Sequence, residues 1–231
     1  DIVLLPLDSK EAIKSIQNAV ESGRISIERI NQSYNRIITA KKELGLFDIK
    51  NNQSWSDVEN NVKISDNTQI ASLIAEKSIT LVKNQSLSLP VIPNKYKKVT
   101  HLFISTDDDL RTRLNLFSND VEYTHENVNE IYVNDPISSL GIKDIINKVK
   151  DSNLIIISML IRIRMNKGVS TIHDSHNLLL QELDKLGIPI IGISFGSPYL
   201  PVYDTLDAYM CAYGYGSISV TAAANALWGR S

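Results

Sequence analysis

The sequence predicts an α/β protein, a three-layer αβα sandwich built around a mainly parallel, flavodoxin-like sheet. Two observations carry this prediction. Short and nearly unbroken apolar runs at 99–105, 153–160 and 189–195 have the length and composition of strands that are buried on both faces. Amphipathic segments lie between these runs, and repeated strand–helix units of this spacing are typical of parallel sheets covered by helices on both sides.

The bulk composition fits a globular protein and excludes several classes of function. The 231 residues are 43% hydrophobic and 22% charged, with a formal net charge of −2, so no global electrostatic field draws the chain to nucleic acid. No apolar run reaches the roughly 20 residues that a membrane-spanning helix needs. The single cysteine, Cys211, cannot form an internal disulfide, and its apolar neighbours in sequence predict a buried thiol.

The first 47 residues are organised differently from the rest. Residues 1–7 predict a short buried strand. Two helices are predicted from apolar stripes that end at glycines, at Lys10–Ser22 and Ser26–Leu44. One strand and two helices cannot bury their own apolar faces, and the chain opens on Asp1 rather than Met. We therefore expect this segment to be the tail of a preceding domain.

The polar and aperiodic residues 48–67 predict a linker, and residues 68–231 are expected to form the α/β sandwich, beginning with an amphipathic helix at Thr68–Lys83. The elements predicted after it are strand Val99–Ser105, helix Leu110–Ser118, strand Ile131–Val133, helix Ile142–Val149, strand Asn153–Leu160, helix Ser175–Leu186, strand Pro189–Phe195, strand Ala208–Tyr213 and helix Ile218–Leu227. In such sheets ligands meet the loops after the carboxyl ends of the strands. Function is therefore expected in the loops 106–109, 161–173 and 196–200.

One of these loops follows a nucleophile-like motif. The run from Gly192 to Gly196 fits the G-x-S-x-G elbow of serine hydrolases, with Ser194 as the nucleophile. An extended stretch rather than a helix follows it, and all four histidines precede Ser194, whereas the elbow order needs one downstream. The two glycines more simply let neighbouring backbone approach the strand end. A serine esterase using Ser194 is therefore the weakest of the functional alternatives.

Two patterns could hold a metal ion. His173 and His176 form an H-x-x-H pair with Asp174 between them. Asp107–Asp109 follows a strand, as magnesium-binding acids do. However, Asp174 or Ser175 is a natural N-cap for the next helix, and the three acids complement the dipole of the helix after them. We expect no metal and no cofactor.

The loop after the central strand carries three cations, Arg162, Arg164 and Lys167. Cations at the mouth of a buried strand can bind an anionic or sugar substrate, because a guanidinium presents several hydrogen-bond donors in a fixed plane. A solvated loop, or a docking surface for another domain, explains the same residues. Both interpretations stay open.

Four motifs, taken in order along the chain, resemble glycoside hydrolase family 3. The matching positions are Ala19-Val20, Gly23, Ile25, Arg36-Ile37, Lys41 and Leu44-Gly45-Leu46-Phe47, then Ala75, Ser78-Ile79-Thr80-Leu81, Lys83-Asn84 and Leu89-Pro90, then Phe195-Gly196, Pro198 and Tyr199, and last the closing AYGYGSISVTAAANALWG. The first set resembles the end of that family's catalytic (β/α)₈ barrel, and the second resembles the helix entering its second domain. The third set is similar to a strand end of the β-N-acetylglucosaminidase branch.

The resemblance implies a C-terminal, second domain of such an enzyme, with residues 1–47 as the tail of its barrel. In this family the nucleophile is an Asp on the barrel, upstream of the last barrel strand. The β-glucosidase branch takes its acid/base, a Glu, from the loop that corresponds to 161–173, which here contains no Glu or Asp. The N-acetylglucosaminidase branch uses a His on a barrel loop instead. The resemblance therefore implies a retaining β-N-acetylglucosaminidase as the parent.

On this interpretation the chain contributes no catalytic residue. It scaffolds the barrel of the same protein and places Arg162 and Arg164 on the rim of the active site. The implied substrate is an amino-sugar glycoside such as a peptidoglycan fragment, which favours a bacterial cell-envelope or periplasmic location, with no nucleic acid and no membrane span. The alternative from another class is a non-catalytic, flavodoxin-like interaction domain.

Overall fold

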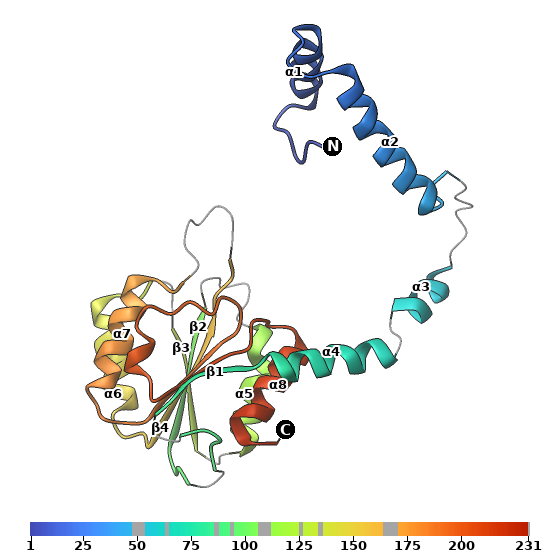
Figure 1. Ribbon diagram of the computed structural model, residues 1–231. Coiled ribbons are helices and arrows are strands. Elements are labelled where there is room, and N and C mark those ends of the chain that lie inside the picture. The colour runs from blue at the N-terminus through green and yellow to red at the C-terminus, as the bar shows by residue number, and fades with distance from the viewer. Residues whose placement is uncertain are drawn as a thin grey trace. The chain divides into compact units, whose positions relative to one another are not determined.

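A computed structural model describes residues 1–47, 54–62, 65–85, 88–92, 95–105, 112–124, 127–133, 136–163 and 171–230 (Figure 1). By its internal contacts the chain divides into two compact units, Asp1–Val62 and Lys63–Ser231. Within the described ranges, no helix is both long enough and apolar enough to cross a membrane.

The first unit consists of helices. The two predicted helices are confirmed as α1 (Ser9–Glu21) and α2 (Ile27–Glu43), and α3 (Trp55–Val62) follows them. The Asp8 carboxylate accepts hydrogen bonds from two backbone N–H groups at the start of α1, and Ser26 caps α2 in the same way.

The prediction of a strand at residues 1–7 is wrong. These residues form no strand, and Leu4 is 84% exposed. A strand is stable only where a neighbour pairs with its backbone N–H and C=O groups, and the described part of this unit offers only helices. Asp1 instead forms ion pairs with Arg29 (2.9 Å) and Arg36 (3.0 Å) of α2.

The predicted linker, residues 48–67, contains more helix than the sequence predicts. Within the predicted linker 48–67, α3 is helical and α4 (Ser65–Ser78) has already begun; residues 48–53 and 63–64 lie outside the described ranges. The predicted helix Thr68–Lys83 is wrong in its last part, because Thr80–Asn84 forms strand β1. The run Ile79–Val82 is rich in β-branched residues, which favour strands where a partner strand is at hand.

Six strands of the second unit form one sheet in the order β1-β6-β5-β4-β2-β3. The bounds of the remaining strands are β2 Val99–Ser105, β3 Val128–Val133, β4 Leu154–Leu160, β5 Ile190–Ser194 and β6 Ala208–Cys211. Strands β2 to β6 pair in parallel, and β1 pairs with β6 in the antiparallel direction. The parallel strands follow the flavodoxin-like order, with β2 first in sequence and second in space.

Helices cover both faces of this sheet (Figure 1). On one face lie α6 (Ser139–Val149) and α7 (Asp174–Asp184), and on the other lie α5 (Asn115–Thr124) and α8 (Ser217–Trp228). The side chains of β4 alternate between the two cores, with Leu154, Ile156 and Leu160 in the α5/α8 core and Ile155, Ile157 and Met159 in the α6/α7 core. The predicted layers and mainly parallel sheet are therefore confirmed.

One predicted helix is misplaced. The helix expected at Leu110–Ser118 is α5, which runs from Asn115 to Thr124 after a 3-10 turn at 112–114. Phe117 and Val121 lie four residues apart on α5 and are fully buried. Packing of this stripe against the sheet, rather than local helix propensity, sets the bounds of α5.

The C-terminal segment is fastened to α5 by a polar cluster. Asp120 of α5 accepts a hydrogen bond from the indole N–H of Trp228, and its carboxylate pairs with Arg230 at 2.7 Å. The Arg230 guanidinium lies 6.0 Å from the Trp228 ring centroid. These contacts hold the last turn of α8 against the neighbouring helix.

A histidine–serine pair is buried within the sheet itself. His101 of β2 and Ser158 of β4 point to the α5/α8 face, with Nε2 and Oγ 2.8 Å apart and both side chains buried. The ring of Phe117 packs on His101 with centroids 5.6 Å apart. Burial lowers the pKa of His101 to about 4, because the imidazolium would lose its hydration. His101 is therefore a neutral core residue at pH 7.

Candidate functional site at the carboxyl edge of the sheet

The candidate site lies where the parallel strands end. After β4 the structure describes residues 161–163 and 171–173, after β5 residues 195–200, and after β6 residues 212–216. Arg164, Lys167 and Asp107–Asp109 lie outside the described residues. These stretches after β4, β5 and β6 make up the described part of the candidate site.

The loop after β5 is held firmly against the start of the loop after β4. The backbone N–H of Ser197 donates to the Ile161 carbonyl at 3.0 Å, and Tyr209 Oη donates to the Pro198 carbonyl at 2.7 Å. Gly196 has a φ of 133°, and a Cβ at this position would lie 2.4 Å from the Ile161 oxygen. Only glycine fits this close approach, so the prediction of a close backbone approach is confirmed for Gly196. It is wrong for Gly192, where a Cβ would meet the side chains of Leu206 and Met159 instead.

Ser194 is built into the fold rather than presented to a substrate. Its side chain is fully buried, and its hydroxyl donates to the Ser197 carbonyl. No helix follows β5 directly; the chain continues through an extended stretch to a short 3-10 helix, Tyr203–Thr205. Both features are the opposite of a nucleophile elbow, which exposes its serine on a sharp strand-to-helix turn.

Burial keeps two ionisable groups near this loop, the Tyr209 phenol and the Cys211 thiol, in their neutral forms. Burial is the main cause that raises the pKa of Tyr209, and burial likewise raises the pKa of the Cys211 thiol. Cys211 is buried, as the sequence predicts. A raised pKa disfavours the thiolate, so Cys211 is not poised for nucleophilic chemistry.

The histidine pair does not come together as a metal site. His173 is the N-cap of α7, with Nδ1 accepting from the backbone N–H of Ser175 at 3.1 Å. The cap is therefore His173 itself, not Asp174 or Ser175 as predicted. His176 is fully buried, and its ring centroid lies 6.4 Å from that of His173. Among the described residues, no group of three His, Cys, Asp or Glu side chains could hold a metal ion.

The exposed side chains on the described part of this edge include one cation, two tyrosine rings, Ile163 and His173. Arg162 is exposed at the end of β4, Tyr199 is 67% exposed after β5, and Tyr213 is 48% exposed after β6. Tyr213 has a φ of 57°, an unusual conformation for a bulky residue, and its hydroxyl donates to Thr80 Oγ1 at 3.0 Å. The described loops of this rim carry no carboxylate. Sequence reasoning missed the two tyrosines, although aromatic residues directly after buried strands were the available signal.

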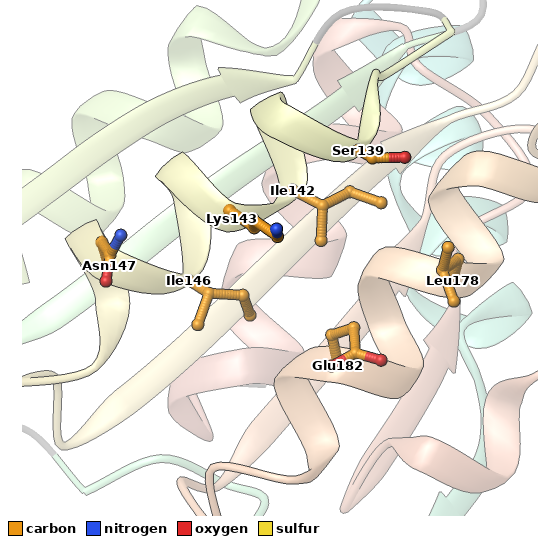
Figure 2. A pocket seen from close by; sticks show the side chains of 7 residues that line it. All are labelled: Ser139, Ile142, Lys143, Ile146, Asn147, Leu178 and Glu182. Atoms are coloured by element: carbon orange, nitrogen blue, oxygen red, sulfur yellow. The ribbon is translucent and has the colours of Figure 1, made fainter.

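The structure also has a hollow on the outer face of α6 and α7, away from the strand ends. It has a volume of about 460 Å³, and Figure 2 shows Ile142 and Ile146 of α6 facing Leu178 and Glu182 of α7 across it. Its lining combines the apolar side chains of Ile142, Ile146 and Leu178 with exposed polar groups, and it lies away from the loops in which ligands of such sheets bind. The carboxyl edge therefore remains the better candidate site.

No family model matches the sequence, and no curated protein matches it either. Solved structures do match in fold. A β-glucoside phosphorylase, BglX, bound to 2FGlc, gives a TM-score of 0.74 at 21% identity, over 98% of this chain and 41% of that chain. A glycoside hydrolase family 3 β-N-acetylglucosaminidase from Paenibacillus sp. str. FPU-7 gives 0.68 at 21% identity, over 96% of this chain and 41% of that chain. A fungal multi-domain GH3 β-N-acetylglucosaminidase gives a TM-score of 0.66 at 19% identity, over 96% of this chain and 24% of that chain.

These likenesses concern the fold, and they cover almost all of this chain. The chain spans 41% or less of the length of each of these three proteins. It therefore has the fold of one part of a glycoside hydrolase family 3 enzyme. The resemblance to the C-terminal domain of that family, stated above from ordered sequence motifs, is confirmed at the level of the fold.

Proposed function

We propose that this chain is the C-terminal domain of a glycoside hydrolase of the β-N-acetylglucosaminidase type, with residues 1–47 as the tail of the catalytic barrel. In this role it scaffolds the barrel and lines the rim of the active site with Arg162 and Arg164. It supplies neither the nucleophile nor the acid/base. The observation that carries the proposal is the set of firmly held loops after β4, β5 and β6, whose described residues include no Asp or Glu, on a fold shared with that family.

The chemistry of glycoside cleavage supports the choice of branch. A retaining glycosidase needs two groups that flank the scissile bond, most often a pair of carboxylates. The loop 161–173 follows the central strand β4 and has no Asp or Glu, although the resemblance places the β-glucosidase acid/base there. Ser194 and Cys211 offer no substitute, because both are buried. A parent that takes both catalytic groups from its barrel fits this composition.

The exposed apolar surface of the first unit supports a larger protein. In α1 and α2, Ile13, Ile27 and Tyr34 are each more than half exposed, and α2 has no buried residue. Helices with one apolar stripe normally bury it against a partner. A barrel formed by the same protein would cover these faces.

The proposal is tested by hydrolysis of a chromogenic N-acetylglucosaminide. The 231-residue chain should be inactive, and the enzyme that includes the barrel should be active, with a weaker response to the matching glucoside. Adding inorganic phosphate would separate hydrolysis from phosphorolysis, since one structural match is described as a phosphorylase. Activity of the chain alone, or none in the longer enzyme, would contradict the proposal.

The rim role has its own test in the longer enzyme. Arg162→Ala should lower kcat/KM about fivefold or more, which corresponds to roughly 1 kcal/mol of lost transition-state stabilisation. Lys143→Ala is the matched control, because Lys143 is an exposed cation on α6, away from the strand ends. Equal kinetics for the wild-type enzyme and the Arg162 variant would remove Arg162 from the rim.

The second candidate is a non-catalytic interaction domain with a flavodoxin-like sheet. It is favoured by the same lack of a catalytic constellation. It predicts that no substitution on the rim changes kcat/KM of the longer enzyme. A serine esterase would be revived only by ester hydrolysis that is lost in Ser194→Ala, and the buried, hydrogen-bonded Ser194 hydroxyl argues against it.

A further inference from the structure

The opposite, amino-terminal edge of the same sheet carries two adjoining hollows. The larger, of about 490 Å³, lies beside the segment leading into β2, and the smaller, of about 410 Å³, lies at the starts of β2 and β3. Ser152, just before β4, lines both of them. We call the two hollows together the trough; they lie at the amino ends of the strands, opposite the carboxyl rim.

The trough is lined by lysines. Lys95 and Lys97 line the larger hollow, and Lys98 and Lys148 line the smaller one. The residues lining the larger hollow include no Asp or Glu. In the smaller hollow Asp151 is present, and Lys148 is already paired with Asp144 at 2.6 Å. The positive charge of the trough is therefore concentrated at Lys95, Lys97 and Lys98.

Helix dipoles do not explain these three lysines. Lys148 and Lys150 lie at the carboxyl end of α6, where a cation offsets the partial negative charge of the helix terminus. Lys95, Lys97 and Lys98 belong to no helix and are all exposed. The backbone of Lys98 is fixed by Asn153, whose N–H donates to the Lys98 carbonyl at 2.8 Å. Lys95 Nζ lies over the Tyr96 ring, 5.1 Å from its centroid, and among the described residues no ion pair involves Lys95, Lys97 or Lys98.

The uncharged residues that line the trough favour a negatively charged polysaccharide over other polyanions. The hydroxyls of Thr100 and Ser152 lie 2.7 Å apart, and Asn127 and Asn129 add amide groups beside them. The half-buried ring of Tyr96 lines the larger hollow. Hydroxyl and amide groups suit the hydroxyls of a sugar. No arginine lines either hollow, although arginine is the usual residue for nucleic-acid phosphates.

We propose that this trough binds an acidic polysaccharide, with Lys95, Lys97 and Lys98 pairing with its carboxylates. The site would hold a charged glycan at the edge of the domain remote from the carboxyl rim. The inference rests on the lining of the trough and does not depend on which glycoside the parent enzyme cleaves.

The test measures binding of the full 231-residue chain to polygalacturonate, a carboxylated polysaccharide, with neutral dextran as comparison. Binding is expected at 50 mM salt and should weaken about tenfold or more by 300 mM, because salt screens exposed charges. Lys95→Glu/Lys97→Glu should weaken it at least tenfold, and Lys95→Ala/Lys97→Ala should weaken it less. The matched control is Lys41→Glu/Lys42→Glu in α2, which makes the same change in net charge and should stay within twofold of wild type.

Several results would overturn the proposal. They are an absence of binding, equal binding to dextran, or an equal loss in the Lys41/Lys42 control, which would make the effect one of net charge. Tighter binding to duplex DNA or to anionic vesicles than to polygalacturonate would assign the trough to another class of partner. Circular dichroism of each variant must match the wild-type chain, and the alanine pair provides the test if the charge reversal does not fold.

Discussion

Acidification should weaken the fold through His101, and the size of the effect follows from its burial. The pKa of His101 is about 4 in the folded chain, against 6.5 for an ordinary histidine. Between these values the unfolded chain binds a proton that the folded chain does not, so the free energy of unfolding rises with pH across this window. The stabilisation is complete above pH 6.5 and is lost as the pH falls towards 4. At pH 5 the loss from this residue is about 2 kcal/mol, with a limit near 3 kcal/mol.

The assay is urea unfolding followed by circular dichroism at pH 7.5 and pH 5. The comparison is His101→Leu/Ser158→Ala, which removes both partners of the buried hydrogen bond together and so leaves no unpaired hydroxyl. Carboxylates titrate in both proteins alike, so the difference between their pH responses isolates His101. The wild-type chain should lose about 2 kcal/mol more than the variant between these pH values. An equal loss in both proteins would refute the reasoning, because it would mean that the imidazole is hydrated or protonated in the fold.

Three further predictions concern stability and use the same unfolding measurement. Gly196→Ala should cost about 3 kcal/mol or more, because its Cβ would meet the Ile161 carbonyl at 2.4 Å, whereas Gly216→Ala, with open space around it, should cost far less. Asp120→Ala should cost about 1–3 kcal/mol, since it removes the acceptor shared by the indole and guanidinium of the C-terminal segment; no change would mean that this cluster is solvated. Asp8→Ala should lower the helicity of α1 and cost about 1 kcal/mol in the first unit, and Asp8→Asn should retain most of the cap.

The parts of the fold that the sequence predicts well are those whose pattern has one physical explanation. β2 was predicted with its observed bounds, and β4 within one residue, because a strand buried on both faces must be apolar at nearly every position. The helix stops at Gly23 and Gly45 also agree with the structure, since both residues have positive φ after a helix. In these places the local sequence and the tertiary structure favour the same conformation.

The errors fall where a partner distant in sequence decides the outcome. The apolar run at 1–7 could form a strand only beside another strand, and Thr80–Asn84 is a strand because β6 pairs with it. Over only five residues, the apolar pattern of an amphipathic helix is hard to distinguish from the alternating apolar pattern of a strand. The unusual backbone of Tyr213 is likewise beyond local prediction, because it depends on the contact of its hydroxyl with Thr80, more than 100 residues away.

The described loops after β4, β5 and β6 combine firm backbone support with an absence of Asp and Glu, and this combination bears on the role of the carboxyl rim. Hydrogen bonds from Ser197 to Ile161 and from Tyr209 to Pro198 fix the loop after β5. The Ser194 hydroxyl donates to the Ser197 carbonyl and so stabilises the same turn. A loop fixed in this way can position a substrate, since orientation needs rigid contacts and not titratable groups. Chemistry at a glycosidic bond needs groups that exchange protons, and the described loops hold no Asp or Glu, while their exposed His173 is engaged as the N-cap of α7. These features agree with the role proposed above, in which the rim orients a sugar for catalytic residues that the barrel supplies.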